Sequence, residues 1–364
     1  MRPTAHPSNP WRRRAAALLA TLALTSAVAA CSDSSDDVGA NDSVTLRLLT
    51  HDSFAVSDGV LAAFTKDTGI KVELVQGGDA GTVVNQAILT KGAPQGDVLY
   101  GIDSTFLTRA LDEDLFVPFE AAALDQVDPS LLLDAKDRVT PIDYGDVCLN
   151  YDKEWFASHD VPVPASLEDL TKPAYKDLLV AENPATSSTG LAFLLSTVEH
   201  FGPDGWQAYW SELKANGVQV ENGWEEAYNS VFSGGGVSTG TRPLVVSYAS
   251  SPPAEVIYAD PPVDEAPTGV IEAGCYRQVE GAGVLKGTDH AEEAGKLIDF
   301  MLSKRFQSDV PLSMFVYPVR SDVALPAAFT SYAVAPDGVV ALDAADIDAH
   351  RDEWIDQWTD LVGR

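Results

Sequence analysis

Short runs of alternating apolar and polar residues recur along the first third of this chain, and each is followed by a stretch with helical spacing. Residues 44–50 alternate as a strand, and 58–68 place apolar residues on one helical face. The same order repeats in 70–75, then a helix over about 83–91, then a strand over 97–103. Strands that alternate with helices predict an α/β fold with a parallel sheet.

The later part of the chain continues this pattern with longer elements. We expect an extended segment over 139–151 that is broken near 143–146, strands at 178–180, 244–246 and 275–285, and helices at 191–200, 206–215, 289–303 and 346–361. In the last helix, Trp354 and Trp358 are four residues apart, which indicates one packed face. The length of the chain favours two lobes.

Aromatic and hydroxyl side chains gather where one predicted strand ends. The run at 244–246 stops in Ser247, Tyr248, Ala249, Ser250 and Ser251, and a tryptophan, Trp224, lies upstream in a turn. Ligands of open α/β sheets bind at the carboxyl ends of strands, so this stretch predicts a cleft for a small, flat, partly polar molecule. The alternative is that Trp224 and Tyr248 are half-buried packing residues.

Two polar turns precede predicted helices. The glycine-rich turn at 77–82 contains Asp79, which opposes a phosphate and suits a cation or a hydrogen-bond donor; the alternative is a helix cap. The loop at 183–190 contains Ser187 and Ser188 and could hold an oxyanion at the helix start. Ordinary capping by serine or threonine is the alternative.

The first 43 residues predict export and anchoring. A basic cluster at 12–14 precedes an apolar run at 15–30, as in a signal peptide over residues 1–30. The small residues before Cys31 resemble a bacterial lipobox, so Cys31 is predicted to carry lipid, with 31–43 as a polar tether. The alternative is an ordinary signal peptide with a chance cysteine.

Charge narrows the classes of ligand. The chain has 24 basic and 54 acidic residues, a net charge of −30. Such acidity opposes binding to nucleic acid and weakly favours cationic ligands.

The remaining cysteines, Cys148 and Cys275, lie in strand-like runs and are a disulfide candidate outside the cytoplasm. The alternatives are two separately buried thiols or a metal site. No His/Cys spacing supports zinc, and we expect neither a metal nor a cofactor.

Six motifs occur in an order that resembles the thiamine-binding substrate-binding proteins of ABC transporters. They are THDSF at 50–54, DYG at 143–145, NPATSSTG at 183–190, GWEEAY at 223–228, SYASSP at 247–252 and YPV at 317–319. The resemblance implies a type II periplasmic-binding-protein fold, with two α/β lobes, crossover strands and a ligand cleft between them. It implies lobe 1 at 44–143 and 277–320, lobe 2 at 144–276, and a C-terminal helical segment, 321–364, packed on the lobes.

The resemblance also implies the residues that would contact the ligand. Asp79 and Ala80 match the pair in the first lobe, Ser187 and Ser188 the hydroxyl pair, and Trp224 the aromatic that packs against thiamine. The full expected set is His51, Asp52, Asp79, Ala80, Ser187, Ser188, Trp224, Tyr248, Ala249, Ser250, Ser251 and Phe315. Three positions depart from the enterobacterial members: His51 replaces a tyrosine, Phe315 a tryptophan and Ala254 a tyrosine. The resemblance places 147–149 beside 275–277, which supports pairing of Cys148 with Cys275.

These observations predict a monomeric lipoprotein that captures thiamine or its phosphates and delivers it to a permease. The same fold with ferric iron, a polyamine or an anion is the alternative. Iron would use Tyr248, His51 and Asp79, but adjacent paired tyrosines are absent. A secreted hydrolase would use Ser247 or Ser250, but no Gly-x-Ser-x-Gly elbow surrounds either serine.

Overall fold

The computed structural model describes residues 44–236 and 238–363 of the chain. The predicted signal peptide, Cys31 and the tether lie outside these residues. From Ser43 onward the chain groups into one compact unit. In the described part of the chain, no helix combines the length and the apolar character needed to cross a bilayer.

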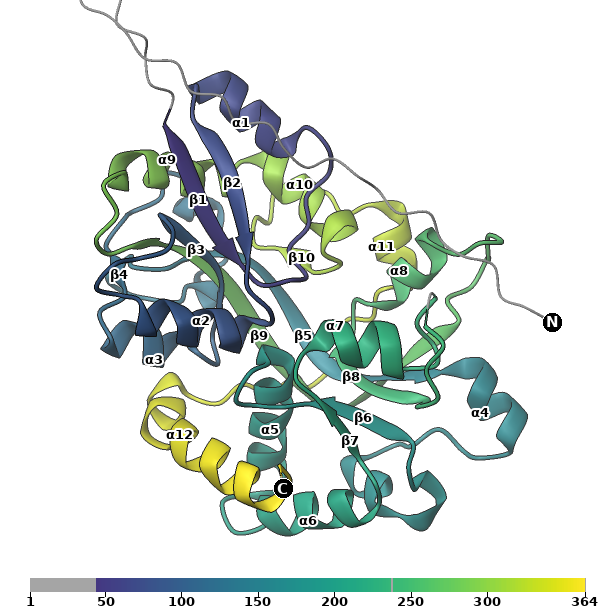
Figure 1. The fold of residues 1–364 in the computed structure, drawn as a ribbon. Helices are drawn as coiled ribbons and strands as arrows, with labels where there is room; N and C mark the ends of the chain where they lie inside the picture. Colours follow the sequence, from purple (N-terminus) through teal and green to yellow (C-terminus); the bar gives the residue numbers. More distant parts are fainter. Residues whose placement is uncertain (1–43, 237, 364) are drawn as a thin grey trace, which may run out of the picture. The chain divides into compact units, whose positions relative to one another are not determined.

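The strands of the described residues form a mixed sheet in the order β2-β1-β3-β9-β5-β8-β6-β7, with β4 and β10 paired at its margins (Figure 1). They are β1 (Thr45–Thr50), β2 (Lys71–Gln76), β3 (Val98–Asp103), β4 (Phe116–Val117), β5 (Thr140–Asp152), β6 (Leu179–Glu182), β7 (Gln219–Glu221), β8 (Leu244–Tyr248), β9 (Thr268–Leu285) and β10 (Tyr317–Pro318).

Helices cover the sheet in both of its halves. They are α1 (Val60–Thr68), α2 (Ala80–Leu89), α3 (Leu107–Asp112), α4 (Lys153–His159), α5 (Ser188–Phe201), α6 (Trp206–Ala215), α7 (Trp224–Glu226), α8 (Pro252–Ile257), α9 (Ala291–Met301), α10 (Lys304–Ser313), α11 (Ala327–Tyr332) and α12 (Ala344–Leu361). Short helical turns are η1 (Leu124–Gln126), η2 (Pro129–Leu131), η3 (Leu167–Thr171), η4 (Pro173–Tyr175) and η5 (Ala227–Val231), the last continuing α7 as a π-helical turn.

Two long antiparallel strands, β5 and β9, join the two halves. At one end of the sheet β1 pairs in parallel with β2 and β3, and at the other β6 pairs in parallel with β7 and β8. Between them, β9 pairs with β3 and β5 pairs with β8, while β5 and β9 pair with each other along most of their length. This arrangement of two α/β halves joined by crossover strands is the predicted fold class.

The local pattern predicted most elements, with two corrections. The predicted break at 143–146 does not end the strand, because β5 runs unbroken through it and absorbs irregularity as register shifts against β9. The strand predicted from residue 275 begins at Thr268 instead, since its first residues pair with the second half of β5. The other predicted segments lie within a few residues of the observed ones.

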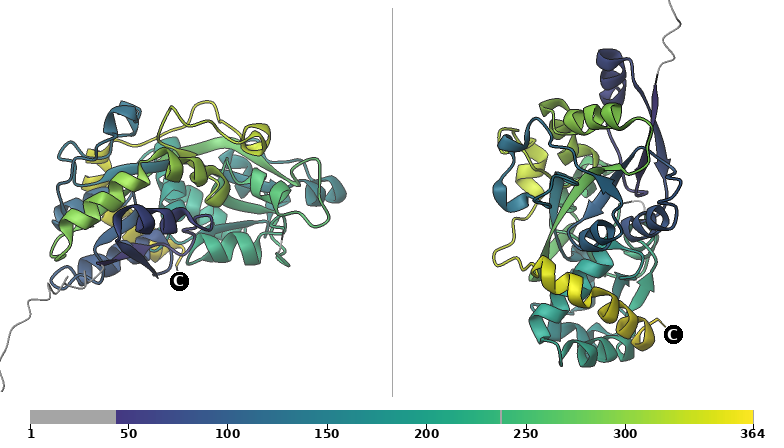
Figure 2. Two further views of the ribbon diagram at one scale, coloured as in Figure 1. Left: turned by 90° about the horizontal axis from the view of Figure 1, so that it is seen from above. Right: turned by 90° about the vertical axis from the view of Figure 1, so that its left-hand side faces the viewer.

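The C-terminal helix α12 contacts both α3 and α6. The buried Trp358 ring meets the Trp210 ring of α6 edge to face at 5.4 Å. On the α3 side, Arg351 Nη1 donates to Thr108 Oγ1 at 3.3 Å. Figure 1 and the right-hand view of Figure 2 show α12, in yellow, next to α6, in teal. The C-terminal segment therefore packs on elements that stand far apart in the sequence.

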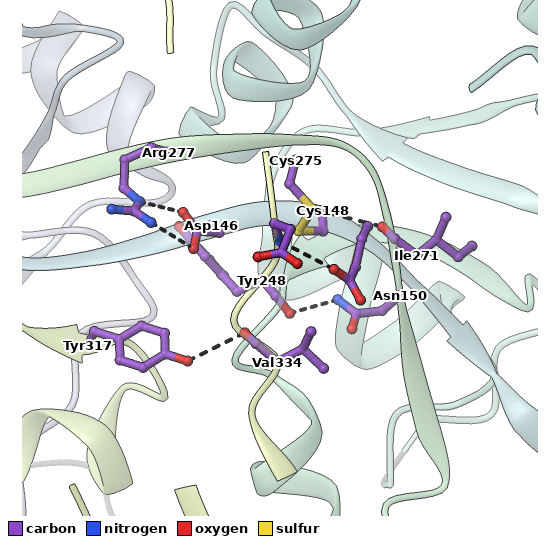
Figure 3. Close-up of a disulfide and its surroundings, with 11 residues drawn as sticks. Asp146, Cys148, Asn150, Tyr248, Ile271, Cys275, Arg277, Tyr317 and Val334 are labelled. Atoms are coloured by element: carbon purple, nitrogen blue, oxygen red, sulfur yellow. Dashed lines mark hydrogen bonds and ion pairs between the residues drawn. A yellow bond between two sulfur atoms is a disulfide. The ribbon is translucent and has the colours of Figure 1, made fainter. Parts of the chain in front are cut away.

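A disulfide joins Cys148 of β5 to Cys275 of β9, 127 residues apart in the chain (Figure 3). It lies where the two strands shift register, between the pairs Val147↔Tyr276 and Leu149↔Ile271. The segment between α11 and α12 covers it: Val334 N–H donates to the Ala249 carbonyl, and Val340 N–H donates to the Cys275 carbonyl. The disulfide thus holds together the strands that connect the two halves.

We expect reduction of this disulfide to lower the free energy of unfolding. A disulfide typically contributes about 2–4 kcal/mol, and the loop-entropy model gives about 5 kcal/mol for a loop of this size. Urea unfolding of the chain from Ser43 onward, oxidised and with both cysteines reduced and blocked, measures the difference. Coincident unfolding curves would show that the cross-link contributes nothing to stability.

Candidate functional site

A cleft opens where the two halves meet, among the carboxyl ends of strands and the starts of helices. The volume of the cleft, including the solvent space at its opening, is about 800 Å³. The side chains that line it are His51, Asp52, Ser53, Asp79, Ala80, Asp143, Gly145, Ser188, Thr189, Trp224, Tyr228, Tyr248, Ser251, Ala254, Gln278, Glu280, Met314, Phe315 and Val316. Among these lining residues there are four carboxylic acids and no lysine or arginine.

Nine of the twelve predicted contact residues line this cleft. They are His51, Asp52, Asp79, Ala80, Ser188, Trp224, Tyr248, Ser251 and Phe315. They come from the turn after β1, the starts of α2, α5 and α7, the end of β8 and the segment before β10. Residues that are far apart in sequence therefore meet around one space.

The other three predicted residues lie behind the lining. Ser187 is the cap of α5, where its hydroxyl accepts from Gly190 N–H and bonds to Thr189 Oγ1 at 2.9 Å. Ala249 packs beside the disulfide. Ser250 is fully buried, and its hydroxyl has no hydrogen-bond partner within the described residues. Each of these three residues is next to a lining residue in the sequence, and the local direction of the backbone decides which of the two side chains faces the cleft.

One wall of the cleft is aromatic. The Trp224 and Tyr228 rings stack at 4.9 Å with an interplanar angle of 21°, and Trp224 Nε1 donates to Ser247 Oγ at 2.9 Å. These contacts hold the indole in place, with the Tyr228 ring against one of its faces. Stacked aromatic faces bind flat and cationic molecules well.

The rings of Tyr248 and Phe315 also line the cleft, and the position of each depends on a special feature of the backbone. Tyr248 donates its hydroxyl proton to Gln278 Oε1 at 2.6 Å, and its ring lies over Gly145. A Cβ at position 145 would lie 2.7 Å from the Tyr248 ring, so only glycine allows this approach. Phe315 has φ of +56°, a left-handed conformation that is costly for a bulky residue. Backbone strain of this kind often marks a functional position.

A buried network of acids forms the polar floor. His51 Nε2 lies 3.3 Å from Glu280 Oε1, and the Tyr100 hydroxyl lies 2.6 Å from both Glu280 and Asp143. A phenol has a single proton, so it cannot donate to both carboxyl groups at once. The geometry fits a second proton in the network, carried by Asp143 and shared with Glu280, while the Tyr100 hydroxyl donates to one carboxyl group at a time.

The pKa directions in this network agree with that assignment. Burial, reinforced by the charge of Glu280, raises the pKa of Asp143 well above its usual range. Burial would also raise the pKa of Glu280, but His51 and the donors around it outweigh burial and lower it. Burial would lower the pKa of His51, but the Glu280 carboxylate reverses this and raises it. These directions favour a charged Glu280 beside a protonated His51 and a protonated Asp143.

Asp79 holds backbone groups from three elements. Its Oδ1 accepts from Ala80 N–H at 2.6 Å and from Ser188 N–H at 3.1 Å, and its Oδ2 accepts from Trp224 N–H at 2.9 Å. Burial raises the pKa of Asp79, and these donors oppose the rise. Asp79 is the cap of α2, as the capping alternative proposed, and it also bonds across to α5 and α7.

Sequence reasoning missed the floor of the cleft. Asp143 and Tyr228 lie in motifs that were recognised, but neither was assigned a role. Gln278 and Glu280 stand two apart in β9, so their side chains share one face of the strand. That spacing was the available signal, but it is equally typical of a solvent-exposed face. Among the described residues, no group of three or more His, Cys, Asp or Glu is arranged to hold a metal ion.

Comparison with known proteins places this geometry in context. Residues 94–337 match the family described as "Bacterial extracellular solute-binding protein". The "Thiamine-binding periplasmic protein" of Salmonella typhimurium is 32% identical over 323 residues, which covers 88% of this chain and 94% of that protein. The protein of the same name from Escherichia coli is 31% identical with the same coverage. A solved structure, "Periplasmic thiamin binding protein", has a TM-score of 0.78 at 30% identity and covers 90% of this chain and 98% of its own.

The His51–Glu280 pair makes a testable prediction. In Glu280→Gln the charge that most strongly opposes burial is lost and only the smaller effects of Asp79 and Asp52 still raise the pKa of His51, so this pKa falls from its wild-type value. NMR titration of the imidazole resonances, assigned by their loss in His51→Asn, measures both values. An unchanged pKa of His51 in Glu280→Gln would show that the ion pair does not control its protonation.

Proposed function

Because the chain belongs to the bacterial extracellular solute-binding protein family, we propose that it captures thiamine outside the cytoplasm and delivers it to an ABC transporter permease. The observation that carries this proposal is the cleft lined by Trp224, Tyr228 and Phe315 together with acids and no basic side chain. Thiamine combines a flat thiazolium cation with an aminopyrimidine. Aromatic faces attract the cation, and buried carboxylates accept hydrogen bonds from amino groups.

The other solutes fit the cleft less well. An anion would meet Asp79 and Glu280 with no lysine or arginine among the lining residues to offset their charge. Ferric iron needs clustered ligands, and the described residues contain no such group of His, Cys, Asp or Glu. A polyamine has no flat surface to place against the Trp224–Tyr228 stack.

The hydrolase alternative has little support. The Ser247 hydroxyl bonds to the Trp224 indole and to Ser251 Oγ at 2.9 Å, so its partners are not a general base. Ser250 is buried behind the lining. The similar proteins are named as binding proteins, not as enzymes. Capture by stacking, hydrogen bonds and closure of the two halves requires no chemical step.

The proposed location is extracytoplasmic, either in the periplasm or at the outer face of the plasma membrane, with the chain anchored to the cell membrane. The binding unit would consist of lobe 1, at 44–143 and 277–320, and lobe 2, at 144–276. Lipid on Cys31, with residues 31–43 as a tether, would hold this unit near its permease. The proposed binding unit is a monomer.

Calorimetry with thiamine tests the proposed ligand. We expect one-to-one binding by the chain from Ser43 onward, weakened roughly tenfold to a hundredfold in Trp224→Ala through loss of stacking and cation–π contact. Trp155→Ala is the matched control, because Trp155 stacks on His159 of α4 and does not line the cleft. No heat with thiamine would refute the proposed ligand, and equal affinity in Trp224→Ala would refute the aromatic wall.

Replacement of Cys31 tests the anchor. We expect the full chain to fractionate with membranes and to incorporate labelled fatty acid, and Cys31→Ser to lose both properties because the acylated side chain is gone. Fractionation and labelling in the producing cells measure this. Unchanged membrane association of Cys31→Ser would favour an ordinary signal peptide.

A further inference from the structure

An exposed tyrosine stands beside the cleft without being part of its lining. Tyr258 follows α8 directly, and 68% of its surface is exposed. All eleven tyrosines of the chain lie within the described residues, and the other ten are buried or half-buried. Burial of apolar ring surface is favourable, so the Tyr258 ring has area available for a further contact.

Two contacts attach Tyr258 to the edge of the cleft. Its ring meets the Phe315 ring edge to face, with the centroids 5.8 Å apart and an interplanar angle of 73°. Its N–H donates to the Ala254 carbonyl at 3.0 Å, which lies one helical turn back along α8. Phe315 and Ala254 both line the cleft. Residues four apart share one face of a helix, so Tyr258 stands on the side of α8 that faces the cleft.

These contacts leave most of the aromatic surface at this edge uncovered. An edge-to-face pair covers one face of one ring, so the Tyr258–Phe315 contact does not bury the other ring faces. Ala254 contributes only a methyl group to the lining and cannot stack on a ligand. Tyr258 is therefore the side chain that can add an aromatic surface at this edge of the cleft.

The charges of the cleft indicate which ligand would use this surface. The lining contains four carboxylic acids and no lysine or arginine, which favours a cation. Aromatic faces attract cations, and the attraction grows when both partners leave water. A tyrosine ring at the edge adds this attraction and apolar contact without adding charge.

We propose that Tyr258 is a ligand-contact residue, whose ring covers a flat cation bound against Phe315. The inference rests on the proposed function and adds a further ring to the cleft. On binding, the Tyr258 ring exchanges solvent for the surface of the ligand, and the ligand breaks this contact before it leaves. The contribution of Tyr258 is therefore to slow dissociation.

Binding of thiamine to three variants tests this inference. For Tyr258→Ala in the chain from Ser43 onward, we expect the dissociation constant to rise about threefold to tenfold, mostly through a faster dissociation rate. Tyr258→Phe should bind within about twofold of the wild type, because it keeps the ring. Ile257→Ala is the matched control, since Ile257 is the exposed neighbour on α8 and does not line the cleft. Calorimetry measures the affinities, and stopped-flow fluorescence measures the rates.

The outcomes separate this inference from the proposed function. Wild-type affinity and dissociation rate in Tyr258→Ala would overturn the inference and leave the proposed ligand intact. A loss in Tyr258→Phe as large as in Tyr258→Ala would also overturn it, because the hydroxyl and not the ring would then hold the ligand. If the wild type binds no thiamine, the proposed function and this inference both fail.

Chemical modification measures the same contact in the unsubstituted chain. Because Tyr258 is the most exposed tyrosine, we expect tetranitromethane to nitrate it first, and mass spectrometry of its peptide follows the reaction. Saturating thiamine should lower the rate of nitration at Tyr258. An equal rate with and without thiamine, in protein that calorimetry shows to bind thiamine, would overturn the inference.

Discussion

The antiparallel pairing of β5 with β9 is the constraint on which the rest of the structure depends. These strands are neighbours of β3 on one side and β8 on the other, so both halves are attached to them. They also carry the floor of the cleft, Asp143 and Gly145 on β5 and Gln278 and Glu280 on β9. A shift of register by one residue would move each of these side chains to the opposite face of the sheet. The connection between the halves and the shape of the site are thus set by the same hydrogen bonds.

The disulfide and the C-terminal segment reinforce this pairing at its weakest point. Cys148–Cys275 joins β5 and β9 at the place where they change register. Arg277, two residues on, pairs with Asp146 (Figure 3). Its guanidinium also lies over the Tyr144 ring at 5.0 Å. Beside Cys148 in the sheet is Ser247, the acceptor for the Trp224 indole. Rigidity at the register shift is therefore transmitted directly to the aromatic wall.

Local pattern predicted the elements well because each depends on a period of two or 3.6 residues. Trp224 and Tyr248 were also accessible, since they stand beside a turn and a strand end, whereas Phe315 was expected from the resemblance and Tyr228 was not assigned a role. Glu280 and Gln278 could not be predicted, because alternation identifies one face of a strand without showing whether that face meets solvent or the other half of the molecule. The choice between Ser187 and Ser188, or between Ser250 and Ser251, depends on the rotation of one residue at a helix start. Two of the partners of Asp79, Ser188 and Trp224, come from segments more than a hundred residues away, beyond the reach of any local pattern.

The distribution of protons in the cleft follows from the same burial that shapes it. Three charged carboxylates packed together without a basic residue would repel one another strongly in a medium of low polarity. Two features of the structure oppose this repulsion: His51 Nε2 lies 3.3 Å from Glu280 Oε1, and burial raises the pKa of Asp143 well above its usual range. At Asp79, the backbone N–H groups that donate to the carboxylate oppose the rise in pKa that burial causes. An acidic cleft that faces an aromatic wall suits the flat cation of the proposed ligand.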